Sequence, residues 1–91
     1  MEIKWTRRAL SDVSRLYDFL SRVNRQAAAR TVKKLTLAPL SLQSNPHIGE
    51  QLFQFSPDEV RRIFVGDYEI RYQIQASVIY ILRLWHTREN R

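Results

Sequence analysis

Apolar side chains in the first half of the chain recur at helical spacing. A short alternating segment at residues 3–5 predicts a strand, and the hydroxyl of Thr6 is suited to cap a helix directly after it. The apolar stripe that follows consists of Leu10, Val13, Leu16, Tyr17, Leu20 and Val23. The polar residues between them that we expect to face water are Asp12, Arg15, Asp18 and Arg22.

A second helical segment begins after Asn24, which is another capping residue. Residues 27–29 are alanines, which favour helix. The stripe continues through Ala28, Val32, Leu35 and Leu42. Pro39 removes a helical hydrogen bond, but the apolar spacing resumes beyond it, so we expect a kink there and an end at Asn45–Pro46. Two helices joined by such a short turn predict an antiparallel hairpin.

From Val60 onward the period of the apolar positions changes to two. Residues 60–65 predict a strand, and Gly66–Asp67 predicts a two-residue hairpin turn. In the next strand, residues 68–75, one face carries Tyr68, Ile70, Tyr72 and Ile74, and the other carries Glu69, Arg71, Gln73 and Gln75. Ala76–Ser77 turns the chain into a last strand from Val78 to Leu84 or Trp85. In it we expect Tyr80, Leu82 and Leu84 to face the helices.

The predicted order is β-α-α-β-β-β in a single domain spanning residues 1–91. The fold class is α+β, with an N-terminal strand, a helix hairpin and a three-stranded antiparallel meander. We expect the hairpin to pack on one face of a small sheet, and the first strand to complete that sheet beside the last strand.

The chain is strongly basic, with 15 Lys and Arg against 9 Asp and Glu, a net charge of +6. This favours an acidic partner or nucleic acid. The sequence lacks Cys, and its two His are far apart, so we expect no metal site and no cofactor. The longest apolar run, Val78 to Leu82, is too short to cross a membrane, and no signal peptide is visible, so we expect a cytoplasmic protein.

Three segments resemble the RelE/ParE toxin superfamily: residues 59–72 (EVRRIFVGDYEIRY), 79–89 (IYILRLWHTRE) and the loop 45–49 (NPHIG). The resemblance spans nearly the whole chain. It implies the toxin of a bacterial type II toxin–antitoxin system, encoded on a plasmid or a chromosome. It further implies a hetero-oligomer with an acidic antitoxin whose flexible segment wraps the toxin. RelE-like members cut messenger RNA on the ribosome, whereas ParE-like members poison DNA gyrase.

Strand parity places a candidate binding face on the open side of the sheet. Its residues are Arg62, Arg71, Arg83, Trp85 and Arg88. Arginines with a nearby aromatic suit phosphates and stacked bases, and they suit an acidic peptide equally well. In the competing interpretation Trp85 belongs to the core and the arginines pair with Glu59, Glu69 or Asp67.

A catalytic set is the other possibility. Cleavage of RNA by its 2′-hydroxyl needs a proton carrier and cations, and the candidates are Arg71, Arg83, His86 and Arg88. Against this, the resemblance implies further polar residues and a late Tyr, while this chain carries Glu69 on the open face and has no Tyr after Tyr80. We therefore favour a ParE-like, non-enzymatic gyrase poison over a ribosome-dependent endonuclease, with a non-toxic antitoxin-binding relative as a third possibility.

Overall fold

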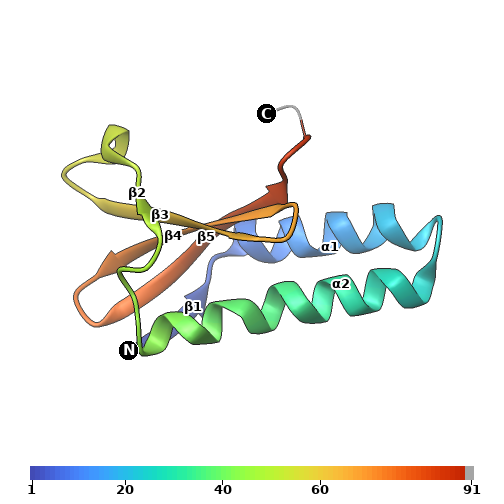
Figure 1. Ribbon diagram of the computed structural model, residues 1–91, viewed down its shortest axis with the longest axis horizontal. Helices are drawn as coiled ribbons and strands as arrows, with labels where there is room; N and C mark the ends of the chain where they lie inside the picture. The colour runs from blue at the N-terminus through green and yellow to red at the C-terminus, as the bar shows by residue number, and fades with distance from the viewer. Residues whose placement is uncertain (90–91) are drawn as a thin grey trace.

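The computed structural model describes residues 1–89, which form one five-stranded sheet with a long helix hairpin on one face (Figure 1). In chain order the elements are β1 (Glu2–Trp5), α1 (Arg7–Ser21), α2 (Arg25–Leu37), the 3₁₀ helix η1 (Ala38–Gln43), β2 (Glu50–Gln51), the 3₁₀ turn η2 (Phe53–Phe55), β3 (Glu59–Val65), β4 (Tyr68–Gln75) and β5 (Val78–His86). The predicted α+β class and element order are confirmed, and the structure adds β2 and η2 in the segment between the hairpin and the meander.

The strands lie in the order β1-β5-β4-β3-β2. The three-stranded meander is antiparallel as predicted, and β1 lies beside β5 as predicted. Because β1 runs parallel to β5, the sheet is mixed. The last strand is therefore an inner strand, which agrees with its apolar character.

Both predicted caps are present. The Thr6 hydroxyl accepts a hydrogen bond from the backbone N–H of Ala9, and the Asn24 side chain accepts one from Ala27. The predicted kink at Pro39 is wrong, because α2 ends at Leu37 and the chain continues as η1. A proline ring clashes with the carbonyl four residues earlier, and the tighter 3₁₀ turn avoids that contact while keeping the chain direction.

The face of α1 that packs on the sheet is shifted from the predicted stripe. Its buried residues are Ala9, Asp12 and Leu16, whereas Leu10 is 55% exposed. Val23 is 91% exposed because it lies beyond the end of the helix. The expectation that Asp12 faces water is wrong: a buried carboxylate occupies the middle of the packed face, where it bonds to β5. The core consists of Ala9, Leu16, Leu35, Leu42, Ile70, Tyr72, Ile79, Ile81 and Leu84.

A β-bulge in β5 reverses the side-chain alternation. Tyr72 pairs with Ile81, but the preceding Arg71 pairs with Arg83, so Leu82 is an extra residue without a partner in β4. Before the bulge Ile79 and Ile81 face the helices, and after it Leu84 does. The prediction that Tyr80 and Leu82 share the helix-facing side with Leu84 is therefore wrong. Tyr80 pairs with Gln73 on the open face.

The loop before β2 is fastened to the sheet through Tyr72. The Tyr72 hydroxyl donates to the Pro46 carbonyl at 2.7 Å and accepts from the Gly49 N–H at 3.0 Å. A Cβ on Gly49 would lie 2.5 Å from that hydroxyl, so only glycine fits this close approach. The Arg61 guanidinium donates to the carbonyls of His47 and Gly49 and holds the same loop from the neighbouring strand.

Candidate functional site

Three arginines form a row across the sheet. Arg62 on β3 lies directly opposite Arg71 on β4, and Arg71 lies directly opposite Arg83 on β5. Side chains in such positions share one face of a sheet and lie close together. Since Ile70 and Tyr72 point into the core, the row starts from the face away from the helices, and the Arg83 side chain extends to the edge of β5, where its guanidinium reaches Asp12 on α1. The alignment of Arg71 with Arg83 depends on the bulge, because without the extra residue the register would be displaced.

Aromatic rings interleave with the arginines. The Arg71 guanidinium lies 4.8 Å from the ring centre of Trp85 and 5.2 Å from that of Phe55, so it is held between two rings. Arg62 lies 5.3 Å from the ring centre of Phe64. Each contact is an arginine–aromatic stack. Phe55 and Phe64 were missed by sequence reasoning. The alternation of Phe64 with Arg62 on β3 was an available signal for one of them, whereas η2, which carries Phe55, has no periodic pattern.

The buried Glu69 carboxylate compensates the charge of two arginines of this row, Arg62 and Arg71. It is 3% exposed, and its carboxylate oxygens lie 3.3 Å from the Arg71 guanidinium and 3.7 Å from that of Arg62. Glu50, on β2, pairs with Arg62 at 3.0 Å. The competing interpretation thus describes part of the arrangement: Trp85 is 3% exposed, and two arginines pair with Glu69.

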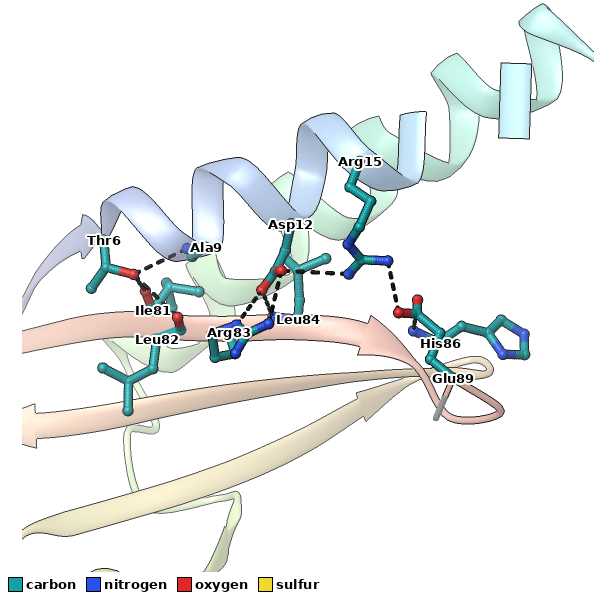
Figure 2. Close-up of polar contacts among 10 residues, drawn as sticks. All are labelled: Thr6, Ala9, Asp12, Arg15, Ile81, Leu82, Arg83, Leu84, His86 and Glu89. Carbon is teal, nitrogen blue, oxygen red and sulfur yellow. Dashed lines mark hydrogen bonds and ion pairs between the residues drawn. The ribbon is translucent and has the colours of Figure 1, made fainter. Parts of the chain in front are cut away.

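Arg83 is compensated by helix α1 (Figure 2). Asp12 accepts hydrogen bonds from Arg83 Nε at 2.7 Å and from the Leu84 N–H at 3.0 Å, and Arg15 approaches it at 3.4 Å. Burial alone would raise the pKa of the Asp12 carboxyl. The bonds from Arg83 and Leu84 and the charge of Arg83 outweigh burial and hold that pKa below its ordinary value. The bond to Asp12 in turn raises the pKa of Arg83.

The same helix covers the edge of β5 where β1 has ended. The Thr6 hydroxyl lies within hydrogen-bond distance of the Ile81 and Leu82 carbonyls, and Asp12 satisfies the N–H of Leu84 two turns further along α1 (Figure 2). A strand edge buried under a helix needs such partners for its backbone groups. Asp12 therefore pairs with Arg83 and also accepts the hydrogen bond of the Leu84 N–H that a neighbouring strand would otherwise accept.

His86 lies on the other face of the sheet from the arginine row. It pairs across strands with Tyr68, and the two rings meet edge to face at 5.1 Å between centres. Its Nδ1 accepts a hydrogen bond from the Arg88 N–H at 3.1 Å, which assigns the proton of the neutral ring to Nε2. Arg88 is exposed on the turn after β5.

The structure therefore brings Arg62, Arg71, Arg83 and Trp85 together and leaves Arg88 apart from them. The catalytic set of Arg71, Arg83, His86 and Arg88 is divided between the two faces of the sheet. Within residues 1–89, no group of three His, Cys, Asp or Glu is placed to hold a metal ion, and no helix is long and apolar enough to span a membrane.

Comparison with known proteins identifies relatives among toxins and toxin–antitoxin systems. Residues 3–91 match the family described as the ParE toxin of the type II toxin–antitoxin system parDE. The chain is 31% identical over 85 residues to Toxin RelE2 of Caulobacter vibrioides, a match that covers 93% of each chain. Its fold is similar to that of a chain from the chromosomal ParDE toxin–antitoxin system of P. aeruginosa, with a TM-score of 0.78, 24% identity, and coverage of 94% of this chain and 95% of that one.

Proposed function

This chain belongs to the ParE toxin family and is the toxin of a type II toxin–antitoxin system, and from that premise we propose that it poisons DNA gyrase and is silenced by a cognate acidic antitoxin. It acts in the cytoplasm as a binding protein, without a hydrolytic reaction of its own. In the silenced state it is one chain of a hetero-oligomer with the antitoxin.

The division of the candidate catalytic residues carries this proposal. General acid–base cleavage of RNA needs a proton carrier within hydrogen-bond reach of the scissile group and cations beside it. His86 lies across the sheet from Arg71 and Arg83, and each of those arginines already contacts a carboxylate. A phosphate approaching Arg71 would also meet Glu69.

The open face is instead suited to recognition of a protein. Arg, Trp and other aromatic side chains carry most of the binding energy in protein interfaces, whereas compensated arginines offer planar stacking surfaces with little free charge. Phe64, beside Arg62, is 55% exposed, and Phe55, beside Arg71, is 38% exposed. We propose Arg62, Arg71 and Arg83, extended by Phe64, as the surface that contacts gyrase, with the buried Trp85 supporting Arg71 and Arg83 from beneath.

A ribosome-dependent endonuclease is the second candidate, because the curated relative is named Toxin RelE2. In that function Arg71, Arg83, His86 and Arg88 would act on messenger RNA bound to the ribosome. This requires messenger RNA to contact both faces near the end of β5, since His86 and Arg71 do not share one.

The test is a pair of assays on purified toxin. Gyrase supercoiling and DNA cleavage are measured beside a ribosome-programmed translation reaction in which messenger RNA ends are mapped. We expect trapped cleaved-DNA complexes and intact messenger RNA. The double variant Arg62→Ala with Phe64→Ser should weaken gyrase inhibition about 10-fold or more, the effect of losing interface anchors.

Matched controls make the outcomes distinct. Arg30→Ala with Leu10→Ser removes the same types of exposed side chain from the helices and should leave gyrase inhibition unchanged. Cut messenger RNA with unaffected gyrase, abolished by His86→Ala, would establish the second candidate. If the unaltered toxin neither inhibited gyrase nor cut messenger RNA, the protein would be a non-toxic antitoxin-binding relative.

A further inference from the structure

The segment between β2 and β3 covers part of the arginine row. It comprises residues 53–58 and includes η2; in Figure 1 it is the yellow-green loop beyond β2, on the side of the sheet away from the helix hairpin. At its base the Leu52 N–H donates a hydrogen bond to the Val60 carbonyl at 2.8 Å. Leu52 and Val60 are both buried, so this base is fixed to β3.

Beyond its base the η2 segment, residues 53–58, has no hydrogen bond to the sheet. The bonds donated by the backbone of Phe55, Ser56 and Asp58 are accepted by carbonyls of the same segment or of Leu52. Within residues 1–89, no hydrogen bond or ion pair joins residues 53–58 to β3, β4 or β5. A segment attached in this way can open locally while the rest of the domain stays folded.

The Phe55 ring is the contact that holds the segment on the arginine row. It stacks on the Arg71 guanidinium at 5.2 Å, and Trp85 lies on the other side of the same guanidinium at 4.8 Å. Between the two rings the Arg71 side chain is 22% exposed. One arginine–aromatic stack favours the closed arrangement by a factor of about 2 to 30, so a partner that binds the open arrangement can displace the ring.

The closed arrangement leaves one donor of Arg71 unused. The Arg71 Nε atom is buried and has no hydrogen-bond partner within residues 1–89, while Nη2 donates to Glu69 at 3.3 Å. Buried polar groups are nearly always paired, and an unpaired donor counts against the state that contains it. A ring stacked on the guanidinium offers no acceptor in its plane. A partner that brings an in-plane acceptor would therefore satisfy Arg71 better than Phe55 does.

The charges around Arg71 select the kind of partner. The buried Glu69 carboxylate already compensates Arg71, so a neutral ring can replace that of Phe55 without adding charge. A nucleobase would bring phosphates close to the carboxylates of Glu69 and Glu50, which repel them. An aromatic side chain of a protein has no such cost, and the backbone beside it supplies carbonyl acceptors.

We propose that Phe55 is a displaceable lid on Arg71, and that an aromatic side chain of the target protein takes its place. This rests on protein recognition by the open face in the proposed function. On binding, the η2 segment moves away about its base at Leu52 and Val60. The target's ring then stacks on Arg71, and a carbonyl of the target accepts from Nε. Until that happens Phe55 is an autoinhibitory contact, because the closed fraction of the toxin does not bind.

The first experiment measures how fast methylglyoxal, an arginine-selective reagent, modifies Arg71, with the modified positions identified by peptide mass spectrometry. Phe55→Ala should speed the modification of Arg71 about 5-fold or more, within the range expected for loss of one stack. Saturating indole should slow it again, because small aromatic molecules refill a cavity left by a removed side chain. The exposed Arg30 calibrates the reagent in each sample.

The matched control is Phe53→Ala, which removes the same side chain two positions away in the same segment. Phe53 is 71% exposed and its ring does not stack on Arg71, so the modification rate of Arg71 should stay unchanged. Equal acceleration by both variants, or no effect of indole on Phe55→Ala, would overturn the proposal. Stronger protection by adenosine monophosphate than by indole would assign the site to a nucleobase and overturn the protein partner.

The second experiment measures gyrase inhibition, where the sign of the change decides. Phe55→Ala should strengthen inhibition about 3-fold or more, since the site on Arg71 is already open. Phe55→Trp should weaken inhibition by about the same factor, because Trp stacks best on a cation. Circular dichroism melts establish that both variants fold.

Weaker inhibition by a folded Phe55→Ala variant would make Phe55 a fixed contact with gyrase and refute the lid. If the unaltered toxin does not inhibit gyrase, the proposed function fails. In that case, faster modification of Arg71 in Phe55→Ala, reversed by indole, would still establish the lid and its aromatic site.

Discussion

Replacement of Asp12 should be the most destabilising change of an ionisable side chain. The carboxylate is buried between α1 and β5, with 6% of its side chain exposed. Asp12→Ala leaves the buried Leu84 N–H without its 3.0 Å acceptor, which costs about 1–3 kcal/mol. It also separates Arg83 from its 2.7 Å partner. Because 31% of the Arg83 side chain is exposed, water replaces part of this bond, and the loss stays below the range for a fully buried pair.

Together these losses amount to about 3 kcal/mol, which for a domain of this size lowers Tm by about 12–24 °C. Asp12→Asn should cost only about 1 kcal/mol, because the amide oxygen still accepts from the Leu84 N–H. The assay is urea unfolding followed by circular dichroism at neutral pH, with the m-value required to stay constant. A loss below about 0.5 kcal/mol for Asp12→Ala would refute the reasoning, since that is the size of an ordinary surface substitution.

The same carboxylate predicts a dependence on pH. Its pKa in the folded protein is lower than in the unfolded chain, so the unfolded state binds the proton more tightly. The stabilisation is complete above the unfolded pKa, about 4, and is lost as pH falls through the folded pKa. The difference in unfolding free energy between the unaltered protein and Asp12→Asn should therefore be constant near neutrality and shrink below pH of about 4. A difference that persisted undiminished at lower pH would show that the charge of Asp12 is not what stabilises the fold.

Three further changes test other contacts. Gly49→Ala places a methyl group 2.5 Å from the Tyr72 hydroxyl and should destabilise the fold by about 2 kcal/mol or more in thermal melts, since overpacking costs about 1–3 kcal/mol and two hydrogen bonds are disturbed as well. Tyr72→Phe removes the bonds to Pro46 and Gly49 while keeping the ring, and a loss of about 1–3 kcal/mol in urea unfolding is expected; a neutral result would mean that water replaces the hydroxyl. Glu69→Gln leaves the stacked Arg71 without its carboxylate, so the free energy of urea unfolding should fall by about 1–3 kcal/mol; an unchanged value would contradict the compensation assigned to Glu69.

Local chemistry made most of the fold predictable from the sequence. Thr6 and Asn24 cap their helices through their own side chains, and Gly66–Asp67 forms its turn within two residues, so neighbouring positions contain the information. The alternation of residues 68–75 gave the two faces of β4 correctly because that strand lacks an internal irregularity. Pro39 was misjudged because both a kinked α-helix and a 3₁₀ helix keep the apolar spacing.

The remaining features depend on contacts between distant residues. The bulge at Leu82 changes which side chains face the core, and the run of apolar residues in β5 gives no period that could reveal it. The helical pattern predicts that Asp12 faces solvent. Its partners, Arg83 and Leu84, lie more than seventy positions away in the sequence, so no local pattern indicates that it is buried. The arginine row was anticipated by strand parity, but its neutralisation by Glu69 and Asp12 required the packed structure.

The place of β5 in the sheet has a consequence for the timing of synthesis. This strand follows the other four strands in the sequence, yet it lies between β1 and β4 in the sheet and is the neighbour of the first strand. While the ribosome still holds it in the exit tunnel, β1 has no neighbour and α1 has no strand edge to cover. The sheet can close only after β5 has emerged, so chains truncated before residue 78 should be unfolded.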